Sequence, residues 1–341
     1  MAVVHRLSFT RLSAREQDDD RFCLNVVFVH GLRGHPRGTW EAEVGTAAAT
    51  AASTSNSSDT TKRSKSLGSF FKRRKARSSS TSTEQAQAPS SVPSSSLPSS
   101  KVFWPEEYLA ADFPQARVWT YGYNADVIGG LFQANNKNSI SQHGQDLSVG
   151  LEREIDNGRP LAFVVHSLGG IIVKDAIRRS ETIREQTKLI IFLGTPHRGS
   201  AYAGWGQIAS NLASLALQDS NKKILETLEV NNEVLDNIHE EFKTIAFKGA
   251  MKIHSLQEAR GITGMKGLDE KVVDDFSSKL DLPRALESVE SIDANHMQMV
   301  RYSSKNDQGY RAVSGILGAF VRRELKTQQI PPVNVADILR T

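Results

Sequence analysis

Short apolar runs recur along the chain and predict the strands of a buried sheet. Three of them are apolar almost throughout, which is typical of strands covered on both faces of a parallel sheet. Three weaker runs predict further strands, the first of them at an edge. The apolar runs cover residues 24–29, 161–165 and 189–193. A further strand is expected over 251–256, and the weaker runs cover 3–9, 117–121 and 288–292.

Helical patterns fill the intervals between these strands. Residues 141–155 carry Leu147, Leu151 and Ile155 at intervals of four, which predicts an amphipathic helix. Two more helical patterns lie between residues 201 and 248, where we expect them to cap the carboxyl edge of the sheet. Strands and helices alternate from end to end, so we predict an α/β fold with an open, mostly parallel sheet and helices on both faces.

The apolar pattern stops between about residues 43 and 102. Ser, Thr and Ala dominate this stretch, and its apolar content is too low to offset the entropy cost of ordering. We therefore predict one domain formed by residues 1–42 and 103–326, interrupted by a disordered insertion over 43–102. Residues 327–341, which include Pro331 and Pro332, are expected to form a C-terminal tail.

The formal net charge of +4 originates in the insertion, where residues 62–77 form a basic cluster. Outside the insertion the chain is slightly acidic, so we expect no nucleic-acid partner. Three roles remain open for the cluster. It is a solvated patch, a nuclear targeting signal, or a docking site on an anionic membrane surface.

Cysteine usage and hydropathy bear on the compartment. Cys23 is the single cysteine, so an internal disulfide is impossible and a reducing compartment is expected. The first 20 residues lack the apolar segment of a secretory signal. No apolar run approaches the roughly 20 residues that span a bilayer. These features predict an intracellular protein that is not secreted.

A serine stands where the strand over residues 161–165 meets a helical pattern. The segment reads His166-Ser167-Leu168-Gly169-Gly170. A strand, a serine on a glycine-backed turn and a helix form a nucleophile elbow, in which the hydroxyl is lifted clear of the sheet. The amide of Leu168 would then face the oxyanion that develops during acyl transfer. One departure is that Val165 replaces the first glycine of the usual G-x-S-x-G motif.

Partners for this serine follow in the chain order expected of an α/β-hydrolase. Glu258 comes just after the strand over 251–256, and His296 follows the last predicted strand. His296 would deprotonate Ser167, and Glu258 would orient the imidazole. Asp274 is the alternative acid. The glycine-rich loop after residues 24–29 offers the amide of Leu32 as the second oxyanion donor.

Other histidines compete for the role of base. His30 and His35 are expected to brace the loop after the strand over 24–29. His197 follows the strand over 189–193, but it precedes every plausible acid and is expected to form a rigid rim. His143 is expected to be a surface or capping residue.

Five motifs, in this order along the chain, resemble the serine esterase (lipase-like) family. The chain is similar to fungal relatives of serine active site-containing protein 1, and more distantly to the inositol deacylases of glycolipid anchors. The resemblance covers nearly all of the chain outside the insertion. The motifs are VFVHGLRGHP (27–36), WTYGY (119–123), HSLGG (166–170), GTPHRGS (194–200) and ANH (294–296).

The resemblance implies an α/β-hydrolase fold, a Ser-acid-His triad and ester or lipid substrates. Glu258 aligns with the family's acid segment, although Gln257, Ala259 and Asn295 depart from the residues usual there. The resemblance also implies association with endoplasmic reticulum or mitochondrial membranes. In fungi such a domain often leads a larger signalling protein.

Three functional hypotheses follow from the sequence. The first is a serine esterase or lipase that needs no metal or cofactor and acts on carboxylic esters such as acylglycerols or phospholipids. The second is a hydrolase-fold module for binding or signalling with weak or no turnover, as Val165 and the insertion favour. The third is a thioesterase or peptidase that uses the same triad.

Overall fold

A computed structural model describes residues 1–13, 22–44, 100–125, 139–199, 204–217, 232–262 and 270–329. The predicted basic cluster and most of the predicted insertion and tail lie outside these residues. The predicted domain boundaries therefore stay a prediction.

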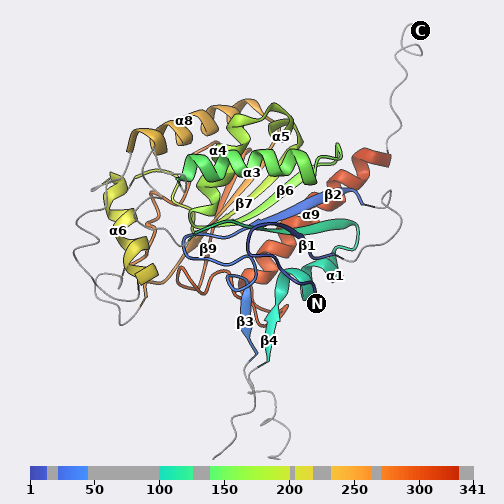
Figure 1. Ribbon diagram of the computed structural model, residues 1–341, viewed down its shortest axis with the longest axis horizontal. Helices are drawn as coiled ribbons and strands as arrows, with labels where there is room; N and C mark the ends of the chain where they lie inside the picture. Colours follow the sequence, from blue (N-terminus) through green and yellow to red (C-terminus); the bar gives the residue numbers. More distant parts are fainter. Residues whose placement is uncertain are drawn as a thin grey trace, which may run out of the picture. The chain divides into compact units, whose positions relative to one another are not determined.

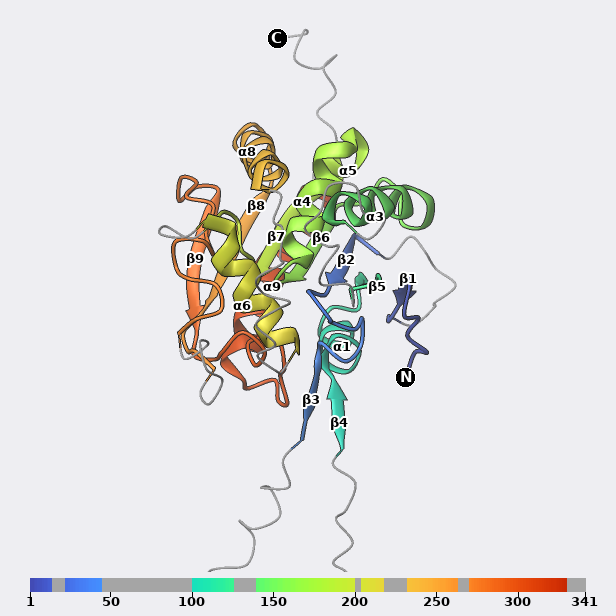
Figure 2. The same cartoon turned by 60° about the vertical axis from the view of Figure 1, so that its left-hand side comes forward.

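A seven-stranded sheet has the strand order β1-β5-β2-β6-β7-β8-β9 (Figures 1 and 2). Only β1 is antiparallel to its neighbour, β5; the five other adjacent pairs are parallel. The predicted α/β architecture with a mostly parallel sheet is confirmed. The strands are β1 (Ser8–Arg11), β2 (Leu24–Val29), β5 (Ala116–Gly122), β6 (Leu161–His166), β7 (Thr187–Leu193), β8 (Lys252–Glu258) and β9 (Glu287–Ile292).

Helices cover both faces of this sheet. Alternate residues of β2 enter different hydrophobic clusters: Val27 joins the cluster that holds the apolar residues of α3, α4 and α8, and Phe28 joins the cluster that holds those of α9. Figure 1 shows these helices on opposite sides of the strands. The helices are η3 (Pro105–Leu109), α1 (Ala110–Asp112), α3 (Ile140–Glu154), α4 (Gly169–Arg179), α5 (Glu181–Gln186), α6 (Gly204–Leu217), α8 (Asn232–Lys248) and α9 (Gln308–Gln329).

The first strand and the helical pair between 201 and 248 differ from their predictions. Strand β1 begins only at Ser8, where a positive φ of 69° interrupts the extended backbone. The helical pair corresponds to α6 and α8. Helix α8 packs along α4 on a face of the sheet, because Phe242 and Ile238 enter the cluster that the α4 residues also occupy.

A second, two-stranded sheet stands on either side of the predicted insertion. Strands β3 (Glu41–Glu43) and β4 (Lys101–Phe103) pair antiparallel, with Glu43 opposite Lys101 (Figure 2). These two strands were not predicted from the sequence. They place both ends of segment 45–99 at one point on the domain. Among the described residues, no helix is long and apolar enough to span a membrane.

Candidate active site

Ser167 lies on a strained turn between β6 and α4. Its φ is 53°, in the left-handed region that residues with a side chain rarely adopt. Two glycines make room for the turn. A Cβ at Gly31 would lie 2.6 Å from Ser167 Cβ, and one at Gly169 would lie 2.4 Å from the His30 carbonyl oxygen. Val165 lies within β6, in register with Val29 and Phe192, so the turn forms without the first glycine.

The loop after β2 approaches Ser167 from the other side. A Cβ at Gly31 would stand 3.2 Å from Ser167 Oγ. The Arg33 amide donates to Ala125 O at 2.9 Å, and the Gly34 amide donates to Gly31 O at 3.0 Å. The amides of Leu32 and Leu168 donate to no other described residue. Leu32 directly follows Gly31, and Leu168 directly follows Ser167. Both amides therefore lie next to the close contact between Gly31 and Ser167.

Glu258 and His296 form a buried acid–base pair. Glu258 is the last residue of β8, and His296 lies in the turn after β9. His296 Nδ1 is 3.2 Å from Glu258 Oε1, and the two side chains are 1% and 0% exposed. The same carboxylate oxygen accepts the Val273 amide at 2.7 Å. A carboxylate partner at Nδ1 favours a proton on that nitrogen and leaves Nε2 free to accept one.

Asp274, the alternative acid, is occupied locally. Its carboxylate accepts hydrogen bonds from the Ser277 amide at 2.8 Å and from Ser277 Oγ at 3.1 Å. These bonds cap the turn over residues 274–278. The structure brings Glu258 to His296 and uses Asp274 to hold the neighbouring segment.

His296 lies against the residues that flank Ser167. The His296 carbonyl oxygen is 2.9 Å from His166 Nε2. A Cβ at Gly194, just past the end of β7, would lie 3.1 Å from His296 Nδ1. Ser167 Oγ and His296 Nε2 are both buried and both lack a hydrogen-bond partner among the described residues.

His30 and His35 brace the loop after β2, as predicted. The His30 ring stacks on Tyr123 with centroids 4.4 Å apart, and its Nδ1 is 3.0 Å from Gly31 O. His35 Nδ1 accepts the amides of Arg37 at 3.1 Å and Gly38 at 3.2 Å. Both rings therefore stabilise the conformation of the loop after β2.

His197 lies in the loop after β7 and is fully buried. Its ring packs edge-on against Phe192, and its amide donates to Ser277 O at 2.7 Å. Burial lowers the pKa of His197 well below its usual value, so the imidazole is neutral. The contacts of His197 therefore stabilise the loop after β7, and His197 does not pair with Glu258.

The prediction that His143 is a surface or capping residue is wrong. The side chain is buried, and its ring packs against Tyr123 with centroids 4.8 Å apart. Burial lowers the pKa of His143. The residue sits on the inner face of α3, one helical turn before Leu147, and helical spacing alone offered that signal.

Lys174 was missed by the sequence reasoning. It lies on α4, its side chain is 0% exposed, and Nζ donates to the His197 carbonyl oxygen at 3.3 Å. Burial lowers the pKa of Lys174 from 10.5 to about 7. No carboxylate of the described residues pairs with it. Its position among Ile171, Ile172, Val173 and Ile177 was the available signal.

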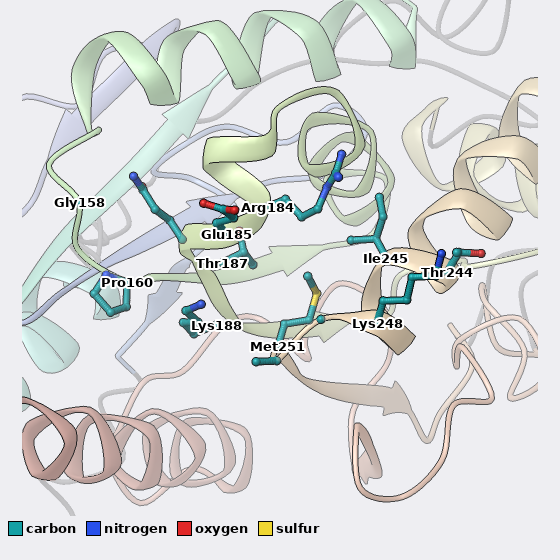
Figure 3. A pocket seen from close by; sticks show the side chains of 13 residues that line it. Gly158, Pro160, Arg184, Glu185, Thr187, Lys188, Thr244, Ile245, Lys248 and Met251 are labelled. Atoms are coloured by element: carbon teal, nitrogen blue, oxygen red, sulfur yellow. The ribbon is translucent and has the colours of Figure 1, made fainter. Parts of the chain in front are cut away.

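A cavity of about 750 Å³ lies at the opposite edge of the sheet (Figure 3). Its lining includes Pro160, Thr187 and Met251, which precede or begin β6, β7 and β8. Two of its cations, Arg184 and Lys248, fall in the last turns of α5 and α8, where positive charge is favourable without a ligand. Because the lining residues lie at the amino ends of the strands, the cavity is remote from Ser167, which follows the carboxyl end of β6. In the described ranges, no cluster of three or more His, Cys, Asp or Glu is arranged to hold a metal ion.

Comparisons with known proteins identify distant relatives. No family model matches the chain. Protein SERAC1 of Danio rerio is 26% identical over 164 residues, which is 46% of this chain and 24% of that protein. Protein SERAC1 of Bos taurus is 33% identical over 107 residues, 29% of this chain and 16% of that protein. The matched part thus spans a quarter or less of these relatives.

Solved structures similar to the chain include a monoacylglycerol lipase from Paleococcus ferrophilus, 12% identical with a TM-score of 0.46 over 92% of this chain and 98% of that one. Mouse alpha/beta hydrolase domain-containing protein 10 is 8% identical, with a TM-score of 0.45 over 95% and 98%. The strand order and the turn at Ser167 define the fold of this chain. The chain has the α/β-hydrolase fold and is a distant homologue of SERAC1, so the predicted resemblance is confirmed.

Proposed function

We propose that this chain is a serine hydrolase that cleaves carboxylic esters through an acyl-enzyme. The observation that carries the proposal is the buried Glu258–His296 pair, 3.2 Å apart. It lies at the carboxyl edge of the sheet, where the strained turn presents Ser167. Ligands of open parallel sheets bind at this edge.

Each residue has a role in the proposed reaction. His296 Nε2 accepts the proton of Ser167 Oγ as that oxygen attacks the ester carbonyl carbon. The amides of Leu32 and Leu168 donate to the oxyanion of the tetrahedral intermediate. The intermediate collapses, and His296 returns the proton to the departing alcohol. Water then attacks the acyl-enzyme by the same route and releases the carboxylic acid.

Glu258 keeps His296 in the tautomer that this reaction needs. Its carboxylate accepts a hydrogen bond from Nδ1–H and stabilises the imidazolium formed during attack. The missing hydrogen bond between Ser167 Oγ and His296 Nε2 is compatible with this role, because such contacts are often longer before substrate binds. Loss of a triad member costs on the order of 10⁴-fold in kcat.

Lipid esters are the proposed substrates, among them acylglycerols and phospholipids. The resemblance of the five motifs to the lipase-like family supports this class. Peripheral attachment to an endoplasmic reticulum or mitochondrial membrane, with residues 62–77 contacting anionic lipid, is proposed on the same ground. A panel of short-chain and long-chain esters, a thioester and a peptide amide would separate esterase, lipase, thioesterase and peptidase activities.

A fluorophosphonate probe tests the nucleophile directly. We expect the wild-type chain to be labelled and Ser167→Ala to remain unlabelled and inactive on p-nitrophenyl butyrate. Ser148→Ala is the matched control, since Ser148 is also buried but lies on α3. Labelling or turnover retained by Ser167→Ala would reject Ser167 as the nucleophile.

A binding module without turnover is the second candidate. Within the part of the chain that the structure describes, Ser167 Oγ and His296 Nε2 have no hydrogen-bond partner, which favours this candidate because an active triad must bring these atoms within about 3 Å of each other. Absence of labelling in a folded wild-type chain, together with lipid binding in a vesicle assay, would favour this candidate over the enzyme.

A further inference from the structure

His166 connects the strand of the nucleophile to the backbone of the base. It is the last residue of β6 and directly precedes Ser167. Its Nε2 lies 2.9 Å from the His296 carbonyl oxygen, within a buried contact. Because a carbonyl oxygen only accepts hydrogen bonds, Nε2 must carry the proton. The two imidazole rings also pack together, with centroids 4.8 Å apart and planes tilted by 43°.

The side chain of His166 is neutral. Burial, followed by the nearby His296, lowers the pKa of His166 well below its usual value, and Arg301 and His30 act in the same direction. The hydrogen bond to the His296 carbonyl opposes this shift only in part. A neutral imidazole has one N–H, and here it is used on the main chain of the base.

His296 is consequently anchored from both sides of β7. Glu258, at the end of β8, holds the ring at Nδ1. His166, at the end of β6, holds the carbonyl group. Gly194 lies between them beyond β7, where a Cβ would come within 3.1 Å of Nδ1. Without His166, the hydrogen bonds that hold the base among the described residues would be those to Glu258 and those within its own turn.

We infer that His166 is a positioning residue, which sets the distance between His296 and Ser167 by holding the His296 carbonyl. The inference rests on the proposed function, because Ser167 and His296 must react for their spacing to matter. A displacement of about 1 Å in a catalytic group costs on the order of 10²-fold in rate. The same strand end thus presents the nucleophile and fixes the backbone of its base.

Two substitutions separate positioning from simple packing. His166→Phe keeps a ring and removes the donor, whereas His166→Gln places an N–H near the original Nε2 position. We expect kcat on p-nitrophenyl butyrate to fall about 10²-fold in His166→Phe with KM nearly unchanged, and to recover substantially in His166→Gln. His143→Phe replaces an equally buried histidine outside the site, and it controls for the loss of a buried imidazole.

The outcomes distinguish this inference from the proposed function. If the wild-type chain hydrolyses esters and a folded His166→Phe variant keeps the same kcat, the proposed role of His166 is rejected. The proposed hydrolase function would still stand. A wild-type chain with neither turnover nor labelling would reject the hydrolase. In that case ¹⁵N NMR of labelled histidines still tests the contact. A neutral His166 with its proton on Nε2 from pH 5 to 8 supports it, and an Nδ1-protonated ring overturns it.

Discussion

Two carboxylates lie near the candidate site, and their hydrogen bonds give them different functions. Glu258 accepts from His296 Nδ1 and from the Val273 amide, while Asp274 accepts from Ser277. We expect Glu258→Gln to lower kcat by about 10⁴-fold, because an amide no longer stabilises the correct tautomer and the imidazolium. Steady-state kinetics with a short-chain ester measures this change.

Asp274→Asn is the matched control for that variant. The amide oxygen still accepts from Ser277, so the turn keeps a cap and kcat is expected to stay within about twofold. If Asp274→Asn lost activity and Glu258→Gln kept it, Asp274 would be the acid. The two variants therefore decide between the sequence-based alternatives.

Gly31 is a position where no side chain fits beside the nucleophile. A Cβ there would lie 2.6 Å from Ser167 Cβ and 3.2 Å from Oγ. We predict that Gly31→Ala displaces the serine or the loop and slows fluorophosphonate labelling by about 10²-fold. Gly38→Ala, in the same loop, meets its nearest atom at an ordinary 3.5 Å and should label normally. Equal labelling of the two variants would contradict the predicted crowding.

Chain order was sufficient to select Ser167, Glu258 and His296 as candidates from the sequence. Each follows a strand, and parallel strands bring their carboxyl ends to one edge. The burial of His143 and Lys174 was indicated only by their spacing within apolar helical patterns, and that signal is weak because a polar residue in such a pattern is usually interpreted as exposed. The bond from His166 to His296 joins residues 130 positions apart, which no local pattern reveals.

At the scale of single elements, α4 contains an uncompensated buried amine. Lys174 has no carboxylate partner among the described residues, and burial lowers its pKa to about 7. We predict that Lys174→Met raises the free energy of unfolding at pH 6 by roughly 1–4 kcal/mol, because the variant need not bury a charge. Chemical denaturation measures the difference. Arg178→Met on the same helix should destabilise instead, since Arg178 Nε pairs with buried Asp175 at 2.6 Å.

The pH dependence of this gain has a definite sign. The unfolded chain binds a proton at Lys174 up to about pH 10.5, whereas the folded chain releases it near pH 7. Wild-type stability therefore rises with pH across this window. The advantage of Lys174→Met should be largest below pH 7 and disappear above pH 10.5. An advantage that does not change with pH would show that Lys174 has the same pKa in the folded and the unfolded chain.

Strands that are buried on both faces were predicted from the sequence. Short strands that form only because they pair with each other were not. The runs at 161–165 and 189–193 became β6 and β7 with small changes at their ends, because their residues are apolar on both faces. Strands β3 and β4 are three residues each, and Glu41, Glu43 and Lys101 give them no apolar pattern. Their pairing depends on Trp40, Phe103 and Trp104 entering the hydrophobic cluster around Phe28.

For the molecule as a whole, the main structural question is whether segment 45–99 contributes to the domain. Glu43 pairs with Lys101, so removing residues 45–99 leaves Val44 and Ser100 as a two-residue connection between paired strands. Two residues suffice for a β-hairpin turn, and Asn-Gly at these positions would match the backbone twist. We predict that the chain shortened in this way folds, with a free energy of unfolding higher by on the order of 1–3 kcal/mol, because closing the predicted disordered insertion between β3 and β4 costs more chain entropy than closing a two-residue turn.

The shortened chain also tests whether catalysis depends on residues 62–77, the proposed membrane contact. We expect the shortened chain to match the full chain in fluorophosphonate labelling and in hydrolysis of a soluble short-chain ester. The reason is that the contacts of Ser167, Glu258 and His296 shown by the structure all lie outside residues 45–99. Binding to vesicles that contain anionic lipid should fall, since residues 62–77 supply the basic cluster. A matched variant with the basic residues of this segment replaced by serine isolates charge from length. Loss of labelling in the shortened chain would place part of the active site in the insertion, whereas unchanged vesicle binding in both variants would remove the cluster as the membrane contact.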